Sequence, residues 1–184
     1  MTPAIVTLEE AVGSGQDTVD LTGYLHLLGA DDHSGSAATS YNSYPLDGTG
    51  QTTTVYSCER WIRARFQGNF IDVRSFRFVA PTLAQPANGW SFKMGTATQY
   101  ATPSTGVSTI AVTPLPVADP GRANPNAGGA TTVVGDGTTT YSDWIVIQAT
   151  VDLSTVDGSG PVYGYTVGGV PVLIEYDFLW TESE

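Results

Sequence analysis

The sequence predicts an all-β protein: a single antiparallel β-sandwich of the jelly-roll or immunoglobulin-like type, with an extended N-terminal arm and long Pro/Gly-rich loops. Three observations indicate this fold. Several segments alternate apolar and polar residues with a period of two, and none has the spacing of an amphipathic helix. Glycine (21) and proline (11) are frequent, and only 14% of the 184 residues are charged. We expect residues 1–17 to form the arm and residues 18–184 to form one domain.

The first stretch of the chain predicts an arm rather than a core strand. Its apolar surface is small and comes from Ile5, Val6 and Leu8, and glycines follow at positions 13 and 15. Such a segment is expected to be mobile in the isolated chain or to pair with the sheet edge of a neighbouring subunit. We therefore assign these three apolar residues to a partner contact.

Residues 18–29 predict the first strand of the sandwich, because valine and leucine alternate there with polar residues. Residues 29–53 predict a long loop. A loop of this length without an element of its own usually has a function or folds over a sheet edge.

The central stretch, residues 54–79, predicts two long strands with a break at residues 67–69. We expect them to form a hairpin that is the spine of the sandwich. Five of the seven basic residues lie in this stretch. The apolar residues change phase in the second strand, which predicts a bulge near Arg74 and Ser75 or a strand covered on both faces.

The charges fall into three blocks. Residues 1–59 carry a formal charge of −8, residues 60–122 carry +5 and residues 123–184 carry −8. Either the central arginines pair with acids on neighbouring strands, or a face of one sign docks on a partner of the other sign. We expect internal pairing, with Glu175 and Asp177 of the last strand as the partners.

Three further strands are predicted at residues 90–100, 145–153 and 172–180, where apolar residues recur at every second position. Residues 101–130 form a proline-rich loop, and proline favours extended backbone at the surface. A stiff, irregular segment of this kind suits contact with another protein. The candidate contact residues in this loop are Pro103, Pro114, Pro116, Pro120, Arg122 and Pro125.

No motif for catalysis, for a metal or for a cofactor stands out. We therefore expect a protein that is not an enzyme and that binds no metal and no cofactor. The chain has two histidines, and neither lies near a nucleophile motif. Asp31, Asp32 and His33 are adjacent, and adjacent residues rarely converge on one metal ion, so a solvated loop is expected there. Four aromatic residues are candidates for a carbohydrate platform, although core and interface positions are expected for them: Tyr41, Tyr44, Trp90 and Tyr100.

The cysteine content and the net charge limit the partners and the compartment. Cys58 is the only cysteine, so no internal disulfide forms, and a buried, inert thiol is expected. The net charge of −11 argues against a nucleic-acid partner, because phosphate contacts need Lys and Arg. No apolar run reaches the roughly 18 residues of a membrane helix, and the first residues lack the pattern of a secretory signal.

Three blocks of the sequence resemble small structural proteins of tailed-phage virions. The blocks are IDVRSFRFVAP at residues 71–81, GWSFKMGTATQYATPSTGVSTIAVTPLPVADPGRANPN at residues 89–126, and TTYSDWIVIQATVD at residues 139–152. The resemblance covers residues 54–153 and implies a homo-oligomeric β-sandwich subunit of the virion, assembled in the host cytoplasm. It implies a capsid decoration (cement) protein that binds the major capsid protein and stabilises the phage head. The alternative is a tail, neck or fibre component with a receptor-binding or carbohydrate-binding role.

Overall fold

A computed structural model describes residues 4–21, 25, 27, 31, 33, 54–68, 70–80, 90–116, 132–134, 139–152, 166–167, 170–171 and 177–183. All regular structure in these residues is β-strand, and every strand pair is antiparallel. The expected all-β, antiparallel class is therefore confirmed for this part of the chain.

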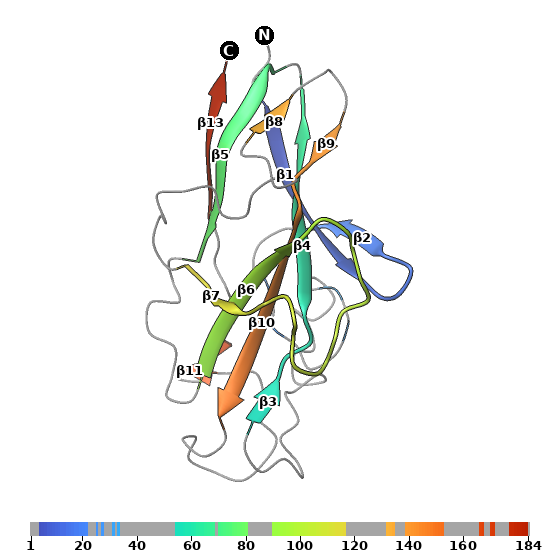
Figure 1. Cartoon of the computed structure of the whole chain (residues 1–184), viewed down its shortest axis with the longest axis vertical. Helices are drawn as coiled ribbons and strands as arrows, with labels where there is room; N and C mark the ends of the chain where they lie inside the picture. Colours follow the sequence, from blue (N-terminus) through green and yellow to red (C-terminus); the bar gives the residue numbers. More distant parts are fainter. Residues whose placement is uncertain are drawn as a thin grey trace.

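The described strands form three sheets (Figure 1). The largest has the order β2-β1-β4-β10-β6-β7, with β3 paired to β10 and β9 paired to β4; the second is β13-β5-β8 and the third is β11-β12. The strands are β1 Ile5–Val12, β2 Asp17–Asp20, β3 Thr54–Tyr56, β4 Arg60–Gln67, β5 Asp72–Val79, β6 Trp90–Ala97, β7 Thr113–Pro114, β8 Thr132–Val134, β9 Thr140–Tyr141, β10 Trp144–Asp152, β11 Thr166–Val167, β12 Val170–Pro171 and β13 Asp177–Ser183.

The N-terminal segment is a strand of the largest sheet, not an arm that leaves the domain. β1 lies between β2 and β4, and Leu8 stands opposite Ala64 in the ladder. The side chains from Leu8 to Val12 are buried. The sequence suggested an arm because its apolar residues are few and glycines follow them. The segment also contains Glu9 and Glu10. Both carboxylates meet arginines of β4, so the strand can be buried without leaving a bare charge.

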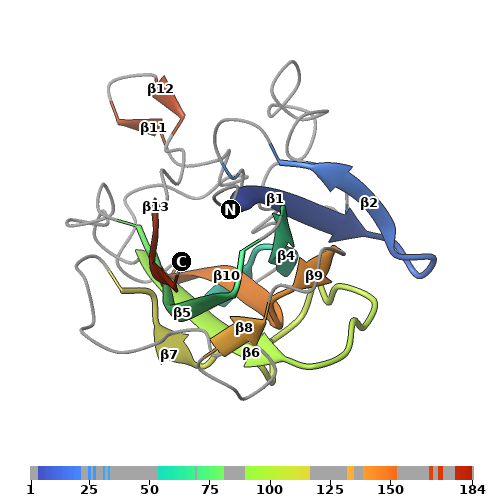
Figure 2. The ribbon, with the colours of Figure 1, turned by 90° about the horizontal axis from the view of Figure 1, so that it is seen from above.

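The predicted central hairpin is wrong, because its two strands belong to different sheets. β4 pairs with β1, β10 and β9, whereas β5 pairs with β13 and β8. In both views β13 lies on the left and β2 on the right (Figures 1 and 2). The predicted bulge in the second strand is confirmed. Leu179 stands opposite Arg77 and Thr181 opposite Arg74, so two residues of β5 oppose one of β13.

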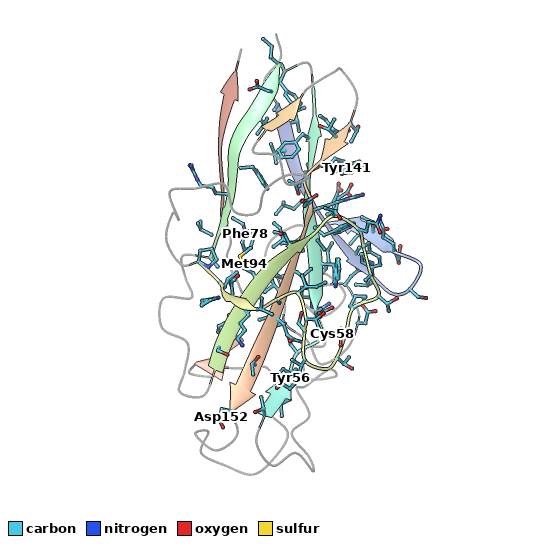
Figure 3. All side chains as sticks on the ribbon, viewed as in Figure 1. Tyr56, Cys58, Phe78, Met94, Tyr141 and Asp152 are labelled. Atoms are coloured by element: carbon cyan, nitrogen blue, oxygen red, sulfur yellow. The ribbon has the colours of Figure 1, made fainter. Side chains whose placement is uncertain are left out.

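The main hydrophobic core draws residues from both of these sheets. Phe66 of β4 and Phe76 of β5 meet edge to face, with 5.3 Å between ring centroids. Phe78 of β5 and Met94 of β6, labelled in Figure 3, belong to the same cluster. A second, smaller cluster lies on the opposite face of the largest sheet and centres on Trp61. The largest sheet is thus buried on both faces in its centre.

Residues 98–112 cover the second cluster and approach the sheet closely at Gly95. A Cβ atom at Gly95 would lie 1.9 Å from the carbonyl oxygen of Ile110. We expect Gly95→Ala to lower the free energy of unfolding by about 1–3 kcal/mol, the usual cost of overpacking, as measured by urea denaturation. Gly106→Ala is the matched control, because its Cβ would meet only Ser104 Oγ at 3.6 Å. Equal stability of the two variants would contradict this close approach.

Candidate functional site

The charged side chains of β1 and β4 gather on both faces of the sheet. On the face of the main core, Arg60 Nη1 lies 3.6 Å from Glu10 Oε1, and these side chains are 1% and 0% exposed. His33 Nδ1 lies 3.9 Å from Glu10 Oε2. His33 Nε2 lies 3.4 Å from Asp17 Oδ2 at the surface. A buried cation and a buried carboxylate thus neutralise each other at the end of the core.

On the other face, one carboxylate holds two arginines. Glu9 accepts hydrogen bonds from Arg63 Nε and from Arg65 Nη1, both at 2.9 Å. Arg65 Nη2 also lies 3.1 Å from Asp20 Oδ1 on β2. Desolvation lowers the pKa of Arg65, but the carboxylates of Asp20 and Glu9 raise it by more, so the net shift is upward. The guanidinium groups are therefore held in fixed positions across β2, β1 and β4.

Internal pairing of the central arginines is confirmed for Arg60, Arg63 and Arg65, but the expected partners are wrong for them. Their acids come from β1 and β2, not from the last strand. The sheet order explains the difference, since β4 lies next to β1 whereas β13 pairs with β5. Glu175 lies outside the described residues.

An aromatic cluster lies beside Arg63 on the outer face. Trp61 meets the rings of Tyr100 and Trp144 at centroid distances of 5.2 and 6.3 Å. Arg63 Cζ lies 3.8 Å from the ring centroid of Tyr141 and 4.5 Å from that of Trp144, which is cation–π geometry. Tyr141 is 42% exposed. Arg63 thus lies against one exposed ring, Tyr141, and one buried ring, Trp144.

Tyr100 belongs to this cluster and not to an exposed platform. Its hydroxyl donates to the carbonyl oxygen of Gly13 at 2.7 Å, in the turn between β1 and β2. Burial raises its pKa, and Asp31 and Cys58 add to the shift. The expected core position of Tyr100 is thus confirmed; Tyr41, Tyr44 and the side chain of Trp90 lie outside the described residues.

The predicted solvated loop at residues 31–33 is wrong for two of its residues. Asp31 Oδ2 accepts a hydrogen bond of 2.9 Å from the Gly13 amide. The His33 side chain is only 12% exposed, beside Glu10. Asp32 is outside the described part of the chain. Among the described residues no group of three or more His, Cys, Asp or Glu is placed to hold a metal ion.

A buried amide fastens the loop of residues 104–108 to the sheet. Gln148 Nε2 donates to the carbonyl oxygens of Ser57 and Gly106 at 2.9 and 2.7 Å, and Gln148 Oε1 accepts from the Ser108 amide at 3.0 Å. Both amide hydrogens and the carbonyl oxygen of this side chain are thus used. The loop is therefore held by the sheet instead of resting loosely on it.

The interruption between β3 and β4 gives the loop a second anchor. Thr150 stands opposite Tyr56 and Ile147 opposite Arg60, so three residues face two of β10, as in a bulge. Glu59 in this bulge accepts hydrogen bonds from Trp61 Nε1 at 3.2 Å and from the Ser104 amide at 3.1 Å. Its own amide donates to the Ser104 carbonyl oxygen.

The thiol of Cys58 is buried in the same bulge, as expected. Burial raises its pKa to about 12, although Arg60 nearby opposes the shift. A thiol that stays protonated at neutral pH is a poor nucleophile. No helix in the described residues is long and apolar enough to cross a membrane.

The predicted contact residues divide into exposed, buried and undescribed ones. Ile5 is 55% exposed and Pro114 is exposed, whereas Val6 and Pro116 are half-buried. Leu8 and Pro103 are buried. The remaining candidates lie outside the described residues: Pro120, Arg122 and Pro125.

Sequence reasoning missed three exposed side chains. Val107 and Val112, within residues 98–112, are 64% and 59% exposed, and Tyr141 of β9 is 42% exposed. A valine in the sequence does not by itself distinguish an exposed position from a core position. The uncharged composition of residues 94–118 was the available signal, because a surface segment usually carries charge.

Comparison with protein-family models, with curated proteins and with solved structures finds no match for this chain.

Proposed function

We propose that this chain is a structural protein of a tailed-phage virion, and specifically a capsid decoration protein that binds the major capsid protein and stabilises the head. The supporting observation is the anchored loop of residues 104–112, which presents Val107 and Val112 to solvent while Gln148 and Glu59 hold its backbone. A preorganised apolar loop loses little entropy when it docks on a flat partner. The resemblance of residues 54–153 to virion proteins supports the same role.

The proposed architecture is a β-sandwich of the jelly-roll or immunoglobulin-like type. The consecutive strands β4 and β5 lie in different sheets, and their residues Phe66 and Phe76 pack against each other. Strands that change sheet between neighbours are typical of sandwiches. This architecture suits a passive subunit that must stay rigid in a shell.

The charge distribution supports a binding role without catalysis. The arginines of β4 are paired with Glu9, Glu10 and Asp20 inside the fold, which supports a structural role for these charges. The net charge of −11 keeps free subunits soluble before assembly and disfavours a nucleic-acid partner. Binding to many shell sites then stabilises the shell by mass action.

The role can be tested on shells of the same phage that lack this protein. We expect the purified chain to sediment with such shells, and Val107→Asp or Val112→Asp to weaken this binding by at least tenfold, because docking would bury the new carboxylate. Val19→Asp is the matched control, since Val19 is an exposed valine of β2, away from the loop. Substitution is preferable to N-terminal truncation, because β1 is a strand of the sheet.

Two results would contradict this proposal. One is undiminished sedimentation of both loop variants. The other is recovery of the protein in purified tails instead of heads, which would favour the tail, neck or fibre role.

A further inference from the structure

The exposed ring of Tyr141 has a defined position on the sheet. β9 pairs with β4 so that Tyr141 stands opposite Arg65. Figure 3 labels Tyr141 at β9, in the upper part of the molecule. One region of the ring lies against Arg63, whose Cζ is 3.8 Å from the centroid, and the side chain remains 42% exposed. The ring therefore presents aromatic surface to solvent from a supported position.

The support beneath the ring is rigid. Arg63 Nε and Nη2 both lie 2.9 Å from Glu9 Oε2, and the Glu9 side chain is only 6% exposed. The same guanidinium also lies over the Trp144 ring. A platform fixed from below loses little side-chain entropy when a ligand stacks on it.

Polar groups flank the ring along the same face of β4. Arg63, Arg65 and Gln67 alternate along this strand and thus share one face. Arg65 is 23% exposed and is bound to Glu9 and Asp20, and Gln67 Nε2 donates to Thr139 Oγ1 at 3.4 Å. Successive residues on one face of a strand are roughly 7 Å apart, so these groups lie about one sugar ring apart.

We propose that this surface, made by Tyr141, Arg65, Gln67 and Asp20, binds a neutral pyranose unit of a glycan. A pyranose offers C–H groups on its face, which stack on an aromatic ring, and hydroxyl groups at its edge, which bind paired guanidinium, carboxylate and amide groups. The two arginines at the site are balanced by the carboxylates of Glu9 and Asp20.

Charge selects the neutral class of ligand. The local cations are already neutralised, and the chain carries a net charge of −11, so an anionic sugar or a nucleotide would be repelled. This inference does not depend on the virion role: a decoration protein and a tail component could each carry such a site, and either proposal can fail alone.

Saturation-transfer NMR on the full chain tests the proposal. The neutral probes are methyl β-D-glucopyranoside, methyl β-D-galactopyranoside and N,N′-diacetylchitobiose, and the anionic probe is N-acetylneuraminic acid. We expect transfer from the aromatic protons to ring protons of a neutral probe. Tyr141→Ala should weaken its binding about three- to tenfold, the value of one stacking contact, whereas Tyr141→Phe should retain it.

A second variant covers the case in which Tyr141→Ala does not fold. Gln67→Ala leaves the stack on Arg63 intact and should still weaken binding of the same probe. The absence of transfer to all three neutral probes would overturn the proposal. Equal transfer in Tyr141→Ala, or transfer to N-acetylneuraminic acid alone, would overturn it as well.

Discussion

Arg60→Met is expected to lower the free energy of unfolding by about 3–5 kcal/mol, because it removes one partner of a buried ion pair. Arg60 and Glu10 are 1% and 0% exposed and 3.6 Å apart. Without the guanidinium, the buried Glu10 carboxylate loses the cation that offsets the cost of its charge in the protein interior. Urea denaturation monitored by tryptophan fluorescence measures the loss.

The double variant Glu10→Leu/Arg60→Met distinguishes the effect of an unbalanced buried charge from the effect of lost packing. With both charges removed, most of the lost stability should return, because apolar replacement of a whole buried pair is often neutral or stabilising. Arg65→Met is the matched control on the same strand: its side chain is 23% exposed, and a partly exposed pair contributes at most about 1 kcal/mol. If the losses of unfolding free energy in the two single variants simply add in the double variant, the two side chains are not coupled and this account is wrong.

Gln148→Leu is expected to lower the free energy of unfolding by about 2–5 kcal/mol, since a leucine of similar size leaves three backbone groups without their side-chain partner, and two of these hydrogen bonds are buried. These groups are the carbonyl oxygens of Ser57 and Gly106 and the Ser108 amide. The loop of residues 104–108 should loosen before the sheet does, because Gln148 joins the two.

Hydrogen exchange provides the local measurement for this variant. The Ser108 amide should exchange faster in Gln148→Leu, while amides of β10 near Ile145 keep their protection. Gln99→Leu is the control, because Gln99 is exposed and a surface change is usually within about 0.5 kcal/mol. Unchanged exchange at Ser108 would show that the loop is held by other contacts.

The strands were predictable from the sequence where their periodicity is local. The predicted strand at residues 145–153 agrees with β10 at Trp144–Asp152, and the strand at residues 90–100 contains β6 at Trp90–Ala97. The bulge in β5 was also predictable, because a shift in the apolar phase is a local signal.

The pairing of the strands was not predictable, because it depends on contacts between distant segments. β4 was expected to pair with the next strand along the chain, yet it pairs with β1 and β10. The first strand was interpreted as an arm because its few apolar residues offer little surface, and the acids Glu9 and Glu10 were not expected to pair with the arginines of β4. Glu9 and Glu10 lie on opposite faces of β1, and each meets an arginine of β4. The sequence signal for this pairing was the combination of two adjacent acids on one strand with several arginines on another.

The site was predictable only in part. The expectation that arginines pair internally was correct for β4, and the buried state of Cys58 was correct. Tyr141 attracted no attention, since a tyrosine in a strand of two residues has no periodicity to interpret. Tyr141 is of interest because it packs on Arg63, which lies on a strand far away in the sequence.

The place of β1 beside β4 has a consequence during synthesis. The first strand leaves the ribosome long before β4, and β10, which completes the centre of the sheet, ends only at Asp152. At about 5–20 residues per second, synthesis from the end of β1 to the end of β10 takes roughly 7–28 s. In that interval Glu9, Glu10 and the β4 arginines act as gatekeepers that discourage aggregation of nascent strands. Charges that neutralise each other after folding thus protect the chain before it folds.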